Sequence, residues 1–100
     1  MDATPDIAEY RLKLREVFPR LQQRYHLAAL ALFGSRVRGD GRSDSDLDML
    51  ARFEVTPSLF TLIMLENELS DLLRVQVDLV LDDSLRPSIR QRVLRELVSV

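Results

Sequence analysis

The chain has 100 residues, of which 46% are hydrophobic and 30% charged, a balance ordinary for one soluble globular domain with a modest core. Its net charge of -2 disfavours stable nucleic-acid binding by this chain alone. Cysteine is absent, which excludes disulfides, thiolate zinc sites and cysteine nucleophiles. No apolar stretch approaches the ~18 to 20 residues of a membrane span, and the first residues are acidic where a signal peptide would be basic. We therefore expect a cytoplasmic protein with no membrane association.

The first half of the chain predicts one long helix followed by a buried strand. Thr4 and Pro5 are typical of an N-cap and a first helical position, and apolar residues then recur at helical spacing as far as Tyr25. We expect Pro19 to kink or split this helix, because proline removes a hydrogen bond and clashes with the preceding turn. Residues 27–33 form an unbroken apolar run that indicates a buried strand.

The second half of the chain alternates strands and helices. The expected elements are a turn-rich loop at 39–45, a strand at 46–53, a helix at 57–73, a strand at 75–81 and a helix at 87–98. This order predicts an α/β (α+β) fold in which a small mixed β-sheet packs against helices, with residues 1–100 forming a single domain.

Carboxylates with metal-binding spacing follow a glycine-serine turn. Gly34-Ser35 ends the first strand, and Asp46 and Asp48 lie two residues apart at the start of the second. In a strand, residues i and i+2 point to the same face, about 7 Å apart. Mg²⁺ usually takes one or two protein carboxylates plus substrate phosphates. Asp78 lies in a third, apolar run, where a carboxylate is costly without a partner, and a metal shared with Asp46 and Asp48 would be such a partner.

These residues also admit other interpretations. The loop lacks the lysine of a Walker A phosphate loop, and the acidic run lacks the glycine and glutamate of an EF-hand. Asp78 has a plain alternative as an edge-strand residue that faces water. Arg36 and Arg38 have a plain alternative as solvated loop residues. Cations beside a triphosphate would nevertheless help to neutralise its negative charge.

The combined pattern is a glycine-serine pair, ten intervening residues, an Asp-x-Asp pair and a later aspartate in a strand. It resembles the polymerase-β-like nucleotidyltransferase superfamily, and within it the minimal nucleotidyltransferase (MNT) group. The resemblance implies that fold, nucleotidyl transfer from ATP and a requirement for Mg²⁺, with two ions expected. By position it implies phosphate contacts from Gly34, Ser35 and Arg38, and metal binding and catalysis by Asp46, Asp48 and Asp78.

The resemblance also implies a partner. Minimal nucleotidyltransferases are typically antitoxins that transfer AMP from ATP to a tyrosine of a HEPN-domain ribonuclease toxin and so neutralise it. One hundred residues leave no separate domain to grip an acceptor, so the acceptor is expected to bring its own positioning surface. The apolar helix at 59–65 fits core packing on two sides or a protein interface. A non-catalytic antitoxin that acts by binding alone, and a transferase for a small molecule such as an aminoglycoside, remain alternatives.

Overall fold

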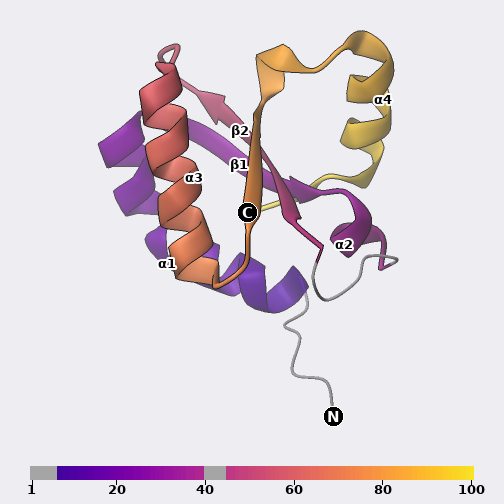
Figure 1. Ribbon diagram of the computed structural model, residues 1–100, viewed down its shortest axis with the longest axis horizontal. Helices are drawn as coiled ribbons and strands as arrows, with labels where there is room; N and C mark the ends of the chain where they lie inside the picture. Colours follow the sequence, from indigo (N-terminus) through magenta and orange to yellow (C-terminus); the bar gives the residue numbers. More distant parts are fainter. Residues whose placement is uncertain (1–6, 40–44) are drawn as a thin grey trace.

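The computed structural model describes residues 7–39 and 45–100. In Figure 1, helices α1 and α3 lie on one side of a twisted sheet and α4 lies on the other, beside the short helix α2. The helices are α1 (Ile7–Tyr25), α2 (Ser35–Arg38), α3 (Leu59–Leu73) and α4 (Pro87–Glu96), with a 3-10 turn η1 (Asp82–Ser84). The strands are β1 (Leu27–Phe33), β2 (Leu47–Phe53), β3 (Val77–Leu81) and β4 (Val98–Ser99).

The sheet is mixed, which confirms the predicted fold class. Its strand order is β3-β2-β1-β4. Strand β1 runs antiparallel to both β2 and β4, whereas β3 runs parallel to β2. The parallel pair is connected by α3, as a crossover between parallel strands requires.

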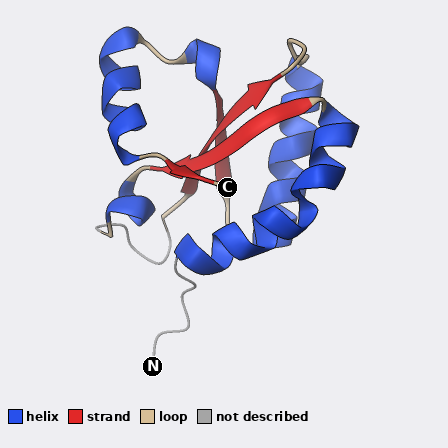
Figure 2. Cartoon of the chain, turned by 180° about the vertical axis from the view of Figure 1, so that it is seen from behind, coloured by secondary structure: helices blue, strands red, loops and turns tan. Residues whose placement is uncertain are grey.

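Alternation along the strands gives the sheet two different faces. One face contributes side chains such as Leu32, Met49 and Val77 to a single core cluster with residues of α1 and α3, including Leu14 and Leu69. All five are fully buried, and each stabilises the fold by about 1.5 to 3 kcal/mol relative to an exposed position. The residues that alternate with them belong to the opposite face, which lies toward α4 (Figure 2).

Helix α1 continues across Pro19, so the expected split is wrong. Pro19 is exposed, whereas Leu14 and Leu21, on either side of it, are buried in the core. Because the proline lies on the solvent side, the missing hydrogen bond does not disturb the buried face. The predicted N-cap at Thr4 lies outside the described residues.

Several predicted boundaries shift. Helix α3 begins after Ser58, whose side chain accepts a hydrogen bond from the Thr61 amide at 3.1 Å and supplies the N-cap. Strand β2 begins at Leu47, and β3 at Val77. Helix α4 ends at Glu96, so its expected extension to Val98 is wrong: Val98–Ser99 is β4, which pairs with β1. The one-turn helix α2 falls where only a turn was expected.

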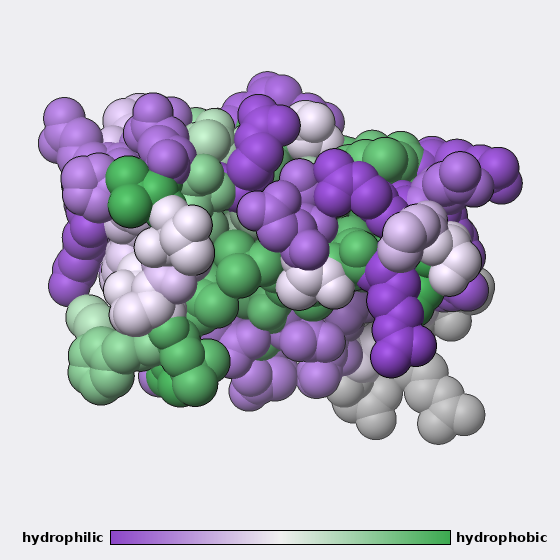
Figure 3. Space-filling model, turned by 90° about the horizontal axis from the view of Figure 1, so that it is seen from above, coloured by the Kyte–Doolittle hydropathy of each residue, from purple (hydrophilic) through white to green (hydrophobic). Residues whose placement is uncertain are grey.

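Of the two alternatives for the apolar start of α3, core packing on two sides does not hold for the chain by itself, and a protein interface stays a prediction. Leu65 and Leu69 are buried, but Leu59 and Phe60 are 73% and 72% exposed. Together with Val55, Ile63 and Met64 they form an exposed apolar surface at the end of the molecule where β2 leads into α3, visible as green at the lower left of Figure 3. No helix of the described residues combines the length and the apolar character needed to cross a bilayer.

Candidate nucleotide and metal site

The sheet topology brings the predicted carboxylates and the glycine-serine turn to one end of the sheet. Because β1 and β2 are antiparallel, the end of β1 meets the start of β2, and Phe33 pairs with Asp48. Because β3 is parallel to β2, its start lies at the same end, and Asp48 pairs with Asp78. Neighbouring strands are about 4.8 Å apart, so these aspartates are adjacent on the sheet. Gly34 follows Phe33 directly.

Gly34 makes the turn between β1 and α2 possible. Its φ of 87° lies in the left-handed region that other residues rarely adopt. A side chain here would also overlap Asp48, because a Cβ on Gly34 would lie 2.9 Å from the Asp48 carboxyl carbon and closer still to Oδ2. The Gly34 carbonyl accepts hydrogen bonds from the Val37 and Arg38 amides, both at 3.1 Å, which winds the chain into α2. The turn therefore lies directly against the Asp48 carboxylate.

The carboxylates interact electrostatically. Burial raises the pKa of Asp48 above its usual value, and the negative charges of Asp78 and Asp46 raise it further. The nearby Arg38 guanidinium lowers the pKa of Asp48, while Glu96 raises it. Closely placed carboxylates that repel one another are suited to bind a divalent cation, which would relieve that repulsion.

Asp78 fits the alternative of an edge-strand residue that faces water, not that of a carboxylate buried in an apolar run. Its side chain is exposed, because β3 is an edge strand and Asp78 lies on the face away from α1 and α3. Its position in an apolar run therefore requires no metal to offset a desolvation cost. What connects it to the site is its pairing with Asp48.

The donor set fits Mg²⁺ without a preformed cage. In the part of the chain that the structure describes, no three His, Cys, Asp or Glu side chains are grouped closely enough to hold a metal ion. Mg²⁺ keeps several waters and completes its octahedron with substrate phosphates, so two adjacent carboxylates are enough for a protein contribution. Asp48 and Asp78 supply that pair, and Asp46 lies just before β2. The metal role of all three remains a prediction.

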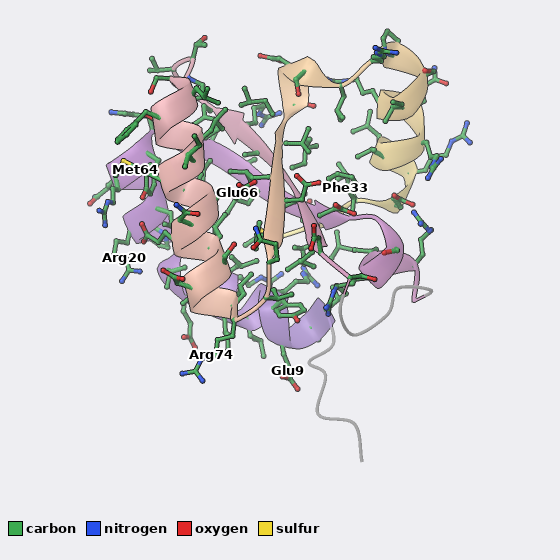
Figure 4. All side chains as sticks on the ribbon, viewed as in Figure 1. Glu9, Arg20, Phe33, Met64, Glu66 and Arg74 are labelled. Atoms are coloured by element: carbon green, nitrogen blue, oxygen red, sulfur yellow. The ribbon has the colours of Figure 1, made fainter. Side chains whose placement is uncertain are left out.

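A pocket of about 450 Å³ opens beside this end of the sheet. It is lined by Phe33, Gly34, Ser35, Arg38, Asp48, Ile89, Arg92, Val93 and Glu96. Figure 4 shows Phe33 near the middle of the molecule, between the strands and α4. The pocket thus joins the predicted phosphate-binding residues to one of the predicted metal ligands.

The structure separates the roles of the two loop arginines. Arg36 donates hydrogen bonds to the Ser45 carbonyl at 2.8 Å and to the Tyr10 hydroxyl at 3.3 Å, which ties the end of the loop to α1. Arg38 instead lines the pocket and forms a salt bridge with Glu96 at 3.1 Å. Arg38 is therefore the better placed of the two to meet a phosphate.

Sequence reasoning missed the contribution of α4. Arg92 and Glu96 line the pocket together with Ile89 and Val93. These positions recur at the three- and four-residue spacing of one helix face. The sequence shows that spacing, but spacing alone does not show which part of the molecule this helix face packs against. The residues 40–44 of the predicted turn-rich loop lie outside the described residues.

A mixed sheet with adjacent carboxylates beside a glycine-serine turn agrees with the nucleotidyltransferase class that the sequence resembles. Comparisons with known proteins agree. The family model described as a nucleotidyltransferase domain matches residues 13–100. Protein adenylyltransferase MntA of Thermococcus cleftensis is 46% identical over 80 residues, which cover 80% of this chain and 81% of that protein.

Solved structures give the same answer. A structure of a candidate minimal nucleotidyltransferase superposes with a TM-score of 0.79 at 36% identity and covers 99% of this chain and 100% of that one. The structure of a tri-AMPylated Shewanella oneidensis HEPN toxin in complex with an MNT antitoxin matches with a TM-score of 0.65, covering 90% of this chain and 70% of that one. At 22% identity, this second likeness shows the fold alone. The chain belongs to the nucleotidyltransferase family, as one of its minimal members, and is an enzyme of that class.

Proposed function

We propose that this chain is a Mg²⁺-dependent protein adenylyltransferase that transfers AMP from ATP to a tyrosine of a HEPN-domain toxin and thereby acts as its antitoxin. The observation that carries the proposal is the adjacency of Asp48 and Asp78 beside the Gly34-Ser35 turn. The 46% identity to a protein named as an adenylyltransferase supports AMP as the transferred group. The structural likeness to an antitoxin bound to an AMPylated HEPN toxin motivates the choice of partner.

The pocket residues divide into two groups in this proposal. Gly34, Ser35 and Arg38 form the phosphate-binding group. Ser35 would donate from its amide and hydroxyl, and Arg38 from its guanidinium, to the β- and γ-phosphates of ATP, whereas Gly34, whose own amide donates to Glu96, would let the turn approach them closely. Asp46, Asp48 and Asp78 would hold Mg²⁺, with two ions expected, and the bound metal would neutralise charge on the triphosphate as the transfer proceeds. The pocket lies on the face of the sheet away from α1 and α3, so the nucleotide would lie between the sheet and α4.

The chemistry is a displacement at phosphorus. The tyrosine oxygen forms a bond to the α-phosphorus of ATP, the bond between the α-phosphorus and the bridging oxygen breaks, and pyrophosphate leaves with that electron pair. The phenolic proton passes to a carboxylate. Asp78 is the suitable acceptor, because it is exposed on an edge strand where a protein side chain has access, whereas Asp48 is packed against Gly34.

The test is the intact mass of the partner. The purified chain is incubated with Mg²⁺, ATP and the product of the neighbouring gene, and that product is examined by mass spectrometry with fragment mapping of any modified residue. We expect one or more AMP groups on a tyrosine. Asp48→Asn should slow the transfer at least about 100-fold, because a metal ligand is lost.

Asp71→Asn is the matched control, because Asp71 is an exposed aspartate on α3. It should leave the transfer unchanged. A partner that is inhibited but unmodified, equally well by wild type and Asp48→Asn, would establish the binding-only antitoxin instead. Turnover of a small-molecule acceptor without the partner would favour the third alternative.

A further inference from the structure

Glu96 links the end of α4 to the predicted phosphate-binding turn. Its side chain is only 16% exposed. Glu96 Oε1 accepts a hydrogen bond from the Gly34 amide at 3.1 Å. The Arg38 guanidinium donates from one nitrogen to both Glu96 oxygens, at 3.2 Å and 3.1 Å. A single carboxylate therefore holds the first residue of the turn and the arginine that closes it.

The position of Glu96 is set by the C-terminal strand. In the β1–β4 pairing, Leu32 is opposite Val98, and the Val100 amide donates to the Leu30 carbonyl at 3.1 Å. Glu96 is the last residue of α4, two residues before Val98, and Gly34 lies two residues after Leu32. The β1–β4 pairing therefore brings the C-terminal end of α4 beside the turn.

The buried turn needs this acceptor. Gly34 is buried, and an amide without a hydrogen-bond partner in such a place costs about 1 to 3 kcal/mol. Since a guanidinium carries five N–H donors, one carboxylate can orient Arg38 without using its whole donor capacity. The Arg38 charge also offsets the Glu96 charge, so the pair adds little repulsion toward an incoming triphosphate.

We propose that Glu96 is a positioning residue for nucleotide binding, which holds the Gly34 turn and directs Arg38 into the pocket. The inference rests on the proposed function, because it assigns that pocket to the triphosphate of ATP. Glu96 itself is not expected to touch the nucleotide. It acts through the two residues that it holds.

The experiment measures the dissociation constant of Mg²⁺–AMP-PNP by isothermal titration calorimetry for the full chain and three variants. Glu96→Ala should weaken binding about tenfold, because it removes an acceptor from a charged donor. Glu96→Gln keeps an oxygen acceptor and should stay within about twofold to threefold of wild type. Glu96→Asp keeps the charge but shortens the side chain, so it should weaken binding and provides a second variant if Glu96→Ala does not fold.

Glu68→Ala is the matched control. Glu68 is a carboxylate of similar exposure, 23%, that pairs with Arg20 and Arg24. Its loss should lower the thermal midpoint without changing the affinity for AMP-PNP, which separates loss of stability from loss of positioning. Hydrogen exchange at the Gly34 amide gives an independent readout, expected to speed up in Glu96→Ala and to stay slow in Glu96→Gln.

The outcomes are distinguishable. Wild type that does not bind Mg²⁺–AMP-PNP overturns the proposed function, and the inference falls with it. Wild type that binds while Glu96→Ala and Glu96→Asp bind equally well overturns only the inference. Tighter binding by Glu96→Gln also overturns it, because the Glu96 carboxylate would then be a competitor of the triphosphate.

Discussion

Replacing Gly34 by alanine tests the contact on which the site depends. Gly34 has a φ of 87° and a ψ of -163°, a conformation essentially restricted to glycine, so an alanine there costs about 1 to 3 kcal/mol. Its Cβ would also overlap the Asp48 carboxylate, and overpacking of this kind costs about 1 to 3 kcal/mol. We therefore expect Gly34→Ala to lower the free energy of unfolding by about 2 to 6 kcal/mol.

Gly39 provides a control for a positive-φ glycine that has no close neighbour. Its φ of 83° is similar, although its ψ is 6° where that of Gly34 is -163°, and among the described residues nothing lies within 4 Å of the position that a Cβ would occupy. Gly39→Ala should therefore cost only the backbone part, about 1 to 2 kcal/mol. The assay is urea unfolding followed by circular dichroism in EDTA, with all variants measured at one pH so that the slopes can be compared.

A double variant then identifies the neighbour responsible. In an Asp48→Ala background the carboxylate is gone, so Gly34→Ala should cost about 1 to 3 kcal/mol less than it does in wild type. If Gly34→Ala costs the same in both backgrounds, or no more than Gly39→Ala, the packing of the turn against Asp48 would be refuted. The steric argument for glycine at this position would fail with it.

Three further predictions concern charge and capping. Burial and the charges of Asp78 and Asp46 raise the pKa of Asp48. In EDTA, wild type should therefore lose stability as the pH rises from the ordinary aspartate range through this raised pKa, and Asp48→Asn should be about 1 kcal/mol more stable at pH 7, a gain absent at low pH in urea titrations. Burial and Glu68, which accepts the Tyr25 hydroxyl at 2.6 Å, raise the pKa of Tyr25 above 10.0. Tyr25→Phe should cost about 1 kcal/mol in thermal denaturation at neutral pH and remove the stability loss expected above pH 10. Ser58→Ala should cost about 1 kcal/mol in urea unfolding, because it removes the cap of α3, and Ser58→Gly should cost less.

The exposed apolar surface at the start of α3 lies away from the pocket beside Gly34. The pocket is at the start of β2, whereas Val55 and Leu59 follow the end of that strand. An acceptor at the pocket does not need to cover this surface.

Local patterns in the sequence were enough to locate the main elements and to single out the candidate metal ligands. Spacing and residue type alone predict an apolar strand that ends at Gly34 and a second strand that carries Asp48. They suffice because turn preference and side-chain alternation act over a few residues. The metal preference for carboxylates likewise needs no knowledge of the fold. The mixed sheet was predictable from the order of the elements.

The tertiary structure decided which of these residues meet. Strand pairing placed Asp78 beside Asp48 and left Asp78 exposed on an edge strand. The folded structure also separated the two arginines: Arg38 lines the pocket, whereas Arg36 donates hydrogen bonds to Ser45 and Tyr10. It also added Glu96, which is 62 residues away from Gly34 in the sequence. No local pattern contains such contacts, because they depend on the register between strands and on the place where the C-terminal segment returns to the sheet.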